Sequence, residues 1–268
     1  MGQAQPERLR VYSWNVCRSN RRLKEALEFI RETAFDLFCL QEVSDAFLAE
    51  LRALPYQLIS AVEVVRRHPN GSDETNHSVI LVSPECHVTG SGQVGFPDAD
   101  SRSLRTRMFV KAMRPFGWLP SRERGGAYVD ISVGVRNIRI FSLHLTLKGP
   151  AARMEQLQAV AATVPERSSA IIAGDLNTSD RPLARLMSFF LGGSLNEMLS
   201  ARRERDSLNG FFSAAHLKNP LDKKVTHGLA GTQLDYVLVP GDSTVLEADV
   251  VKDTHGSDHH PVSVALRY

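Results

Sequence analysis

The sequence predicts an α/β protein, more specifically a four-layer α/β/β/α sandwich in which two packed mixed sheets are flanked by helices. Two observations lead to this prediction. Segments with strand and helix periodicity alternate near both ends of the chain, whereas its middle contains consecutive strand-like segments without helices between them. A chain that combines both patterns fits two sheets packed face to face better than one parallel sheet. We expect a single domain over residues 1–268.

The first segments of the chain form an expected strand, helix and strand. Residues 9–14 alternate in polarity, residues 23–34 carry apolar side chains at helical spacing, and residues 37–40 are an unbroken apolar run. Ser19 or Asn20 is expected to cap the helix. A second helix is expected over residues 44–54.

The middle of the chain is expected to contain short strands at residues 56–59, 78–82, 108–112, 127–133 and 138–145. The last two flank a turn at residues 134–137 and should form a hairpin. Residues 87–104 and 114–126 are expected to be long loops, which in compact domains are often binding loops.

The last part of the chain returns to alternating helices and strands. Pro150 suits the first turn of a helix, and residues 170–173 form a strand of the buried type. A further helix is expected around residues 183–190. Strands are expected at residues 234–239, 245–250 and 262–266.

The composition is that of an ordinary globular protein, with 43% hydrophobic and 23% charged residues. A formal net charge of +2 excludes binding to nucleic acid through overall basic charge alone, so any contact with a polyanion must come from local patches. Three cysteines form no even disulfide framework, and no apolar run approaches the ~20 residues that span a bilayer. We therefore expect a cytoplasmic monomer without stable membrane association.

Polar residues able to bind a metal or move a proton lie at six expected strand ends. These residues are Asn15, Glu42, His144, Asp175 with Asn177, Asp235, and Asp258 with His259. Each one alone has a structural explanation, such as a turn cap or a hydrogen-bonded core histidine. Because strand ends converge in space, six such positions in one chain favour a shared pocket. Carboxylate and amide oxygens suit Mg²⁺ or Mn²⁺, whereas clustered thiolates would favour other metals.

The motifs around these residues resemble those of the endonuclease/exonuclease/phosphatase superfamily, which has the DNase I-like fold. The matching segments run in family order over nearly the whole chain: residues 13–16, 40–43, 142–145, 174–177, 234–236 and 257–261. Each segment is weak evidence alone, but the set is specific. The resemblance implies a divalent-metal-dependent phosphoesterase, because cleavage of an anionic phosphodiester needs charge neutralisation and an aligned water.

The resemblance also implies a role for each residue. Glu42 is expected to be the principal metal ligand, with Asn15 beside it, and Asp258 is expected to contribute directly or through water. Asp175 would orient or deprotonate the attacking water. Asn177 would donate its amide to the phosphoryl oxygens.

Two histidines complete the expected machinery. His144 would stabilise charge on the phosphoryl group, and His259 would contact the phosphate or transfer a proton. Asp235 would fix the tautomer of His259 through a carboxylate–histidine hydrogen bond. Four neighbouring residues have lesser expected roles: His260, Arg153 and Gln156 as structural or peripheral residues, and Thr226 as a residue near the site.

Local basic clusters favour nucleic acid, in particular DNA, as the substrate. The clusters comprise Arg102, Arg105 and Arg107; Arg122 and Arg124; and Lys223 and Lys224, with Phe116 and Trp118 between them. Charge combined with stacking surface suits single-stranded or distorted nucleic acid, although each cluster alone also fits a solvated surface. Residues 226–233 contain no tryptophan, which disfavours the abasic-site endonuclease branch of the family.

Two other functions stay open at this point. A phosphatase or phosphodiesterase acting on phospholipids, inositol phosphates or other small phosphate esters would share every catalytic residue and differ only in its loops. A non-catalytic binding module is disfavoured, because such proteins typically lose a metal ligand or a base, and this chain has the full set.

Overall fold

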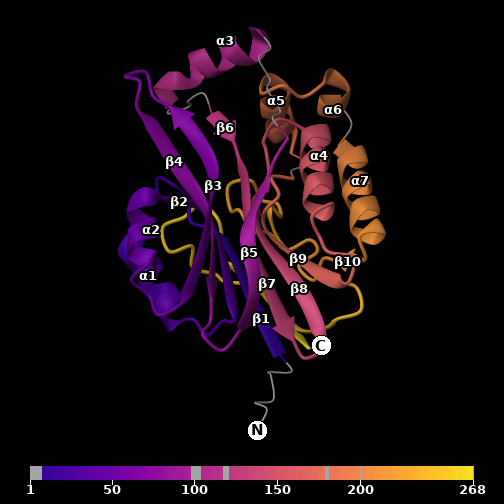
Figure 1. The fold of residues 1–268 in the computed structure, drawn as a ribbon. Coiled ribbons are helices and arrows are strands. Elements are labelled where there is room, and N and C mark those ends of the chain that lie inside the picture. Colours follow the sequence, from indigo (N-terminus) through magenta and orange to yellow (C-terminus); the bar gives the residue numbers. More distant parts are fainter. Residues whose placement is uncertain (1–7, 98–103, 117–120, 179–180, 200, 268) are drawn as a thin grey trace.

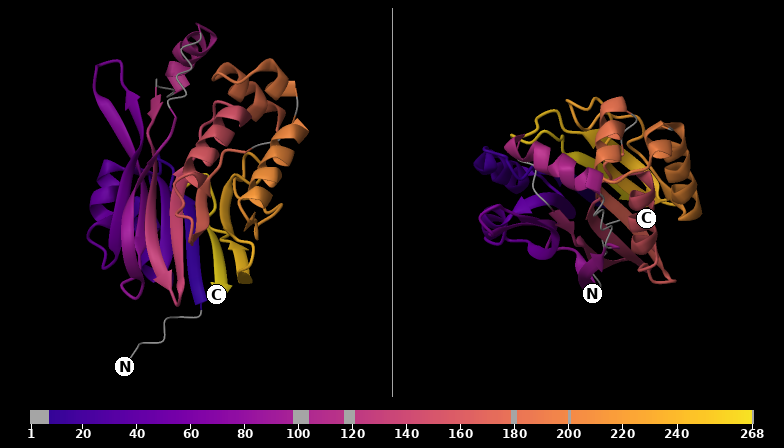
Figure 2. Two further views of the ribbon diagram at one scale, coloured as in Figure 1. Left: turned by 45° about the vertical axis from the view of Figure 1, so that its right-hand side comes forward. Right: turned by 90° about the horizontal axis from the view of Figure 1, so that it is seen from above.

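The computed structural model describes residues 8–97, 104–116, 121–178, 181–199 and 201–267. Within these residues the chain forms two mixed sheets that pack face to face (Figure 1, Figure 2). The seven-stranded sheet has the order β12 (Thr244–Val250), β13 (Val262–Arg267), β1 (Arg8–Asn15), β2 (Leu37–Ser44), β4 (Asp73–Val82), β3 (Gln57–Arg67) and β6 (Ser121–Glu123). The six-stranded sheet has the order β10 (Leu217–Lys218), β11 (Asp235–Pro240), β9 (Ser168–Asp175), β8 (Arg136–His144), β7 (Gly125–Val133) and β5 (His87–Gly95).

Helices cover the outer face of each sheet and one end of the sandwich (Figure 1). The seven-stranded sheet is covered by α1 (Leu23–Glu32) and α2 (Asp45–Leu51), and the six-stranded sheet by α4 (Pro150–Ala161) and α7 (Ala201–Ala214). At the upper end in Figure 1 lie α3 (Leu104–Met113), α5 (Pro182–Phe190) and α6 (Leu195–Leu199), with the short 3₁₀ helix η1 (Arg114–Phe116) after α3. None of the described helices is long and apolar enough to cross a membrane.

Three buried apolar clusters correspond to the three interfaces between these layers. One fills the space between the sheets, with Val11, Cys39, Ile140 and Val264 among its members. The other two lie beneath the helices on the outer faces. Strands buried on both faces account for the unbroken apolar runs in the sequence. The predicted four-layer α/β/β/α sandwich is therefore confirmed.

The largest correction concerns residues 108–112, which were predicted to be a strand and instead belong to helix α3. Tertiary contacts stabilise the helix, because the Phe109 ring stacks on that of Phe190 in α5, with centroids 5.1 Å apart. The guanidinium of Arg105 also lies 3.8 Å from the centroid of the Phe189 ring. A run of five residues, four of which have long, aromatic or β-branched side chains, is ambiguous by periodicity alone, so these contacts decide the helix.

Both predicted loops also contain regular structure. Part of residues 87–104 forms β5, which pairs with β7 despite its glycine-rich sequence. Gly125 allows the close approach, since a Cβ there would lie 1.8 Å from the carbonyl oxygen of Val94. Residues 114–126 contain η1, β6 and the start of β7. The predicted cap of α1 was wrong as well, because Asn20 Oδ1 accepts the N–H of Arg22 before the helix begins.

Candidate active site

Strand pairing brings the predicted catalytic residues together at one end of the sandwich. The parallel register of β8 and β9 places His144 opposite Asp175, and the antiparallel register of β9 and β11 places Asp235 on the other side of Asp175. From the other sheet, Asn15 Nδ2 donates to Asp175 Oδ2 over 3.1 Å. The site is thus built across the two sheets, at the end of the sandwich where α3 lies.

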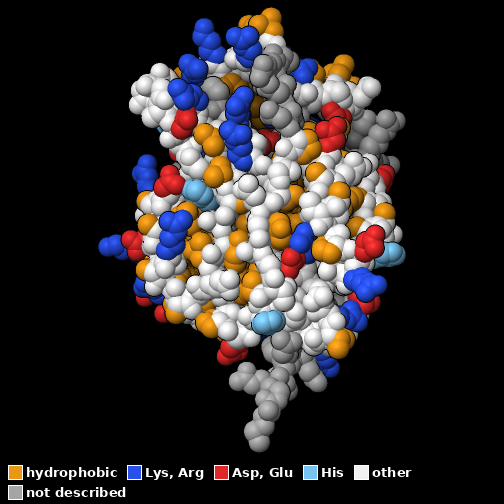
Figure 3. Space-filling view, in the orientation of Figure 1, with side chains coloured by type: hydrophobic (Ala, Val, Ile, Leu, Met, Phe, Trp, Pro, Cys, Tyr) orange, Lys and Arg blue, Asp and Glu red, His pale blue; other side chains and the backbone are white. Residues whose placement is uncertain are grey.

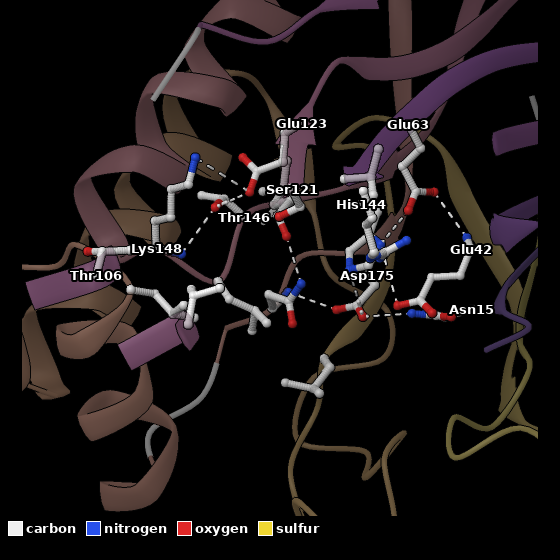
Figure 4. A pocket seen from close by; sticks show the side chains of 18 of the residues that line it. Asn15, Glu42, Glu63, Thr106, Ser121, Glu123, His144, Thr146, Lys148 and Asp175 are labelled. Atoms are coloured by element: carbon white, nitrogen blue, oxygen red, sulfur yellow. Dashed lines mark hydrogen bonds and ion pairs between the residues drawn. The ribbon is translucent and has the colours of Figure 1, made fainter. Parts of the chain in front are cut away.

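A cavity of about 1080 Å³ opens at this end (Figure 4). Seven of the eight predicted site residues line it: Asn15, Glu42, His144, Asp175, Asn177, Asp258 and His259. The eighth, Asp235, is fully buried behind His259. The structure therefore brings every predicted residue together at one site.

The pair formed by Asp235 and His259 has the predicted geometry. His259 Nδ1 lies 2.8 Å from Asp235 Oδ2, which leaves Nε2 directed toward Asp175 Oδ2 at 3.6 Å. Burial alone would lower the pKa of His259, but the charges of Asp235 and Asp175 raise it to about 10. Burial in turn raises the pKa of Asp235 above its usual range, against the opposing effect of His259.

His144 has a matching partner that sequence reasoning missed. Its Nδ1 lies 2.7 Å from Glu63 Oε1, and the second carboxylate oxygen of Glu63 accepts the backbone N–H of Glu42 at 3.0 Å. Burial alone would lower the pKa of His144, but the Glu63 carboxylate, followed by Asp175 and Glu42, raises it to about 10. Glu63 is 2% exposed and sits at a β-bulge. A glutamate at an inward position of an alternating strand was the signal available in the sequence.

Asp175 lies between the two imidazoles. His144 Nε2 approaches its Oδ2 to 3.7 Å, and the backbone N–H of Asn177 donates to its Oδ1 over 2.8 Å. The carboxylate therefore has hydrogen-bond donors on both oxygens and faces the cavity. Asn177 adopts a left-handed conformation, with φ of 52°, and its Nδ2 donates to the carbonyl oxygen of Leu145 over 2.6 Å. Only the second N–H of that amide is left to contact a phosphoryl oxygen.

The donor atoms near Glu42 fit a hard divalent cation. Glu42 Oε2 accepts the N–H of Arg18, while its Oε1 is 3.9 Å from His144 Nδ1. Asp258 is half exposed, and both Asp258 and Asn15 line the cavity. The Asn15 amide oxygen also accepts the backbone N–H of Cys17 over 3.0 Å. Burial raises the pKa of the nearby Cys17 thiol, and its Sγ is hydrogen-bonded to Ser19 Oγ at 3.2 Å. The remaining set consists of oxygen ligands, as Mg²⁺ and Mn²⁺ prefer.

A third histidine, His227, was also missed by sequence reasoning. Its Nδ1 accepts the backbone N–H of Ala230 at 3.0 Å, so the neutral ring carries its proton on Nε2, which lies 3.5 Å from Asp258 Oδ2. This interaction holds the pKa of Asp258 below its usual range. The ring packs edge to face on His259, with centroids 4.6 Å apart. His227, Asp258 and His259 have the composition of a metal site, but the fixed tautomer makes His227 a hydrogen-bond donor.

The four neighbouring residues fall around the site as structural groups. Thr226 Oγ1 accepts the backbone N–H groups of Leu234 and Asp235, each at 3.0 Å, and so fixes the start of β11. The remaining three bond away from the catalytic groups: His260 to the carbonyl oxygen of Val251, Arg153 to Glu204, and Gln156 to Thr146 and Glu123.

Comparison with solved structures shows the same fold in several proteins. A humanized D. rerio TDP2 matches with a TM-score of 0.65 and 16% identity, over 98% of this chain and all of the other. An endonuclease/exonuclease/phosphatase from Beutenbergia cavernae matches with a TM-score of 0.64 and 20% identity, over 97% and 71% of the chains. ANGEL2, a 2′,3′-cyclic phosphatase, matches with a TM-score of 0.61 and 14% identity, over 97% and 95%.

The sequence itself gives a sharper assignment. No curated protein matches the chain. The model of the Endonuclease/Exonuclease/phosphatase family, however, matches residues 12–259, which include every predicted site residue from Asn15 to His259. The chain therefore belongs to the endonuclease/exonuclease/phosphatase family.

Proposed function

We propose that the protein is a Mg²⁺- or Mn²⁺-dependent phosphodiesterase that hydrolyses nucleic acid, with single-stranded DNA as its substrate. One observation carries the proposal of catalysis. The buried carboxylate of Asp175 faces the cavity between two imidazoles, and each imidazole is held by its own buried carboxylate. Such an arrangement has a base and two cationic donors around one point, as phosphodiester hydrolysis requires.

The residues of this chain divide the chemistry as follows. Asp175 accepts a proton from the attacking water, which forms the new P–O bond. His144 stabilises negative charge on the phosphoryl oxygens, because Glu63 keeps its ring cationic at neutral pH. His259 contacts the phosphate through Nε2 and supplies a proton to the departing oxygen as the old P–O bond breaks. Asp235 accepts a hydrogen bond from His259 Nδ1 and so fixes the tautomer of the His259 ring.

Glu42, Asn15 and Asp258 would hold the divalent cation. When bound, that cation neutralises phosphate charge and polarises the P–O bonds. The oxygen-rich donor set on one wall of the cavity supports this assignment.

Nucleic acid is supported by the cations that line the cavity and by one structural neighbour. Arg66, Arg107, Lys111 and Arg114 lie around the space in front of the catalytic groups. A D. rerio TDP2 structure with a TM-score of 0.58 and 17% identity holds a single-strand DNA product. Of the basic residues named from the sequence, Lys224 instead binds the backbone carbonyl of Ala248, and Arg102 lies outside the described residues.

A phospholipid or other ester with an apolar group is the second candidate. Leu104, Met108 and Leu147 are exposed and line the cavity. No Phe, Tyr or Trp side chain lines it among the described residues, and Trp118 lies outside them. Aliphatic surface of this kind suits an acyl chain better than a stacked base.

The experiment that tests both candidates is a hydrolysis panel in Mg²⁺ or Mn²⁺. The substrates are single-stranded DNA, duplex DNA, RNA, a phospholipid and bis-p-nitrophenyl phosphate. Wild-type activity should disappear with EDTA, and Asp175→Asn or His259→Ala should reduce turnover by on the order of 10²-fold or more. His87→Ala is the matched control, since His87 is exposed at the start of β5. Absence of metal-dependent cleavage of every substrate would refute the proposed catalysis, and preference for the phospholipid would refute the choice of substrate.

A further inference from the structure

Helix α3 presents a row of positive charge to the catalytic cavity. Arg107, Lys111 and Arg114 follow one another at intervals of four and three residues, which places them on one side of α3 and η1. All three line the cavity and are exposed. Figure 3 shows basic side chains gathered at the upper end of the molecule, where α3 lies. We call Arg107, Lys111 and Arg114 the α3 cationic row.

The charges of this row are not neutralised within the described part of the chain. No carboxylate there forms an ion pair with any of the three side chains. Other cations of the cavity differ, because Arg66 Nη1 donates to Asn76 Oδ1 over 2.9 Å and lies 3.8 Å from Glu74. Lys148 lies 3.9 Å from Glu123. Beside the catalytic histidines, the α3 cationic row is thus a part of the cavity wall available to an anionic ligand.

The helix that bears this row is fixed to the rest of the molecule. Arg105 Nη2 donates to the carbonyl oxygen of Gly193 over 2.7 Å, and its guanidinium lies over the ring of Phe189. Phe109 stacks on Phe190. These side chains leave α3 on the side away from the row, so α5 anchors the helix while the cations face the cavity. A fixed wall positions charge with less entropy loss than a free loop would.

We propose that the α3 cationic row binds backbone phosphates next to the scissile phosphate of a single-stranded nucleic acid. The proposal rests on the proposed function and adds the subsite that selects a polymer. A cavity of about 1080 Å³ is much larger than one phosphate ester, and Arg107 and Lys111 are about 6 Å apart along the helix axis. Cations placed at intervals along a groove follow a nucleic acid backbone. Since no Phe, Tyr or Trp ring of the described residues lines the cavity and the row itself consists of cations, the contact is with phosphates rather than bases, and sequence preference should be weak.

The test compares a substrate that has flanking phosphates with one that has none. In Arg107→Gln/Lys111→Gln, kcat/KM for a single-stranded oligonucleotide should fall on the order of 10-fold, whereas kcat/KM for bis-p-nitrophenyl phosphate should not change. The slope of log Kd against log salt, measured by fluorescence anisotropy on the inactive Asp175→Asn background, should decrease by about 1.4, or about 0.7 for each lost phosphate contact. The control is Arg31→Gln/Arg52→Gln, which removes the same charge from exposed positions on α1 and at the C-terminal end of α2.

Each alternative outcome is decisive. Equal loss on both substrates would mean that α3 supports the catalytic groups, and would overturn the proposal. So would an unchanged salt slope, or loss of binding to anionic phospholipid vesicles with DNA binding intact. Because binding is measured without turnover, a wild-type protein that cleaves nothing would refute the proposed function, while the anisotropy result would still decide whether the row binds DNA.

Discussion

At the scale of single residues, two buried carboxylate–imidazole pairs set the charge of the site. Glu63 holds His144 and Asp235 holds His259, and each ring has a pKa raised to about 10 despite its burial. Without metal, both rings are therefore cationic at pH 7 in the folded protein. In the unfolded chain their pKa returns to the ordinary value of about 6.5.

This difference predicts how stability depends on pH. The folded-state pKa of each ring is higher than the unfolded one, so protonation of the two rings stabilises the folded protein. This contribution is complete below about pH 6.5 and is lost as pH rises toward about 10. The free energy of unfolding of the metal-free protein, from urea titrations in EDTA, should therefore decrease between these values. His144→Asn should show a smaller decrease. A free energy that is constant or rises over this range would contradict the assignment of His144 and His259 as cations.

Glu63 should matter for turnover although its side chain is only 2% exposed. Glu63→Gln removes the charge that raises the pKa of His144. It also weakens the hydrogen bond that the Glu63 side chain accepts from the backbone N–H of Glu42. Loss of such a supporting partner typically costs 10–100-fold in activity or metal affinity, so we expect kcat for bis-p-nitrophenyl phosphate to fall by about that factor. Glu247→Gln, which removes an exposed ion pair with Arg8, should leave kcat unchanged.

His227 should support metal binding through Asp258. His227→Phe keeps a ring against His259 but removes the N–H that faces Asp258, so Mn²⁺ affinity measured by electron paramagnetic resonance should fall by about 10-fold. His227→Gln still has a side-chain N–H to donate to Asp258, so it should recover part of the lost Mn²⁺ affinity. If both variants bind Mn²⁺ like the wild type, His227 only packs against His259.

At the scale of elements, irregular backbone positions set the direction in which the side chains of the site point. Glu42 has a φ of 57° at a bulge of β2, and the bulge at Glu63 in β3 directs that side chain toward it. Bulges of this kind redirect a side chain without ending the strand. Gly174, next to Asp175, has a φ of 146°, and a Cβ there would lie 1.8 Å from the carbonyl oxygen of Leu143.

Gly174→Ala should therefore damage both stability and activity. The added methyl group would push β9 away from β8 and displace Asp175, and the φ value is itself unfavourable for alanine. We expect a loss of unfolding free energy of at least about 1–3 kcal/mol together with loss of turnover. The control is Gly210→Ala in α7, where nothing lies within 4 Å of the new Cβ; it should stabilise the protein by roughly 0.5–1 kcal/mol. Equal effects at the two positions would refute this account of Gly174.

At the scale of the whole molecule, the site joins the two sheets and gathers negative charge between them. Asn15 and Glu42 come from one sheet, whereas His144 and Asp175 come from the other. A cation bound between the sheets should stabilise the folded state, because the unfolded chain has no such site.

Metal should therefore raise thermal and chemical stability. At 100 times its Kd, Mg²⁺ or Mn²⁺ should add about 2.7 kcal/mol to the free energy of unfolding. The double variant Glu42→Gln/Asp258→Asn should show no such increase. KCl at matched ionic strength controls for screening. A wild-type protein whose stability does not respond to either metal would contradict the proposed metal site.

Much of the site could be predicted because its residues lie at strand ends. Apolar runs identify the strands, and the polar residues that terminate them, such as Asn15 and Asp175, follow directly. Glu63 could not be recognised in this way, because it lies inside a strand rather than at its end, and its partner His144 is 81 residues away in the chain. His227 was missed since its role depends on the backbone of Ala230, which fixes the tautomer.

The sequence by itself determined the layers of the sandwich, the family and the chemical types at the centre, because these depend on local periodicity and on motifs of a few residues. The tertiary structure alone decided what surrounds that centre. Residues 108–112 form a helix because α5 packs against it, and β5 forms because glycines let β7 approach. These contacts join segments far apart in the chain, so no local pattern contains them. They determine the far wall of the cavity, and with it the positions of Arg107 and Lys111.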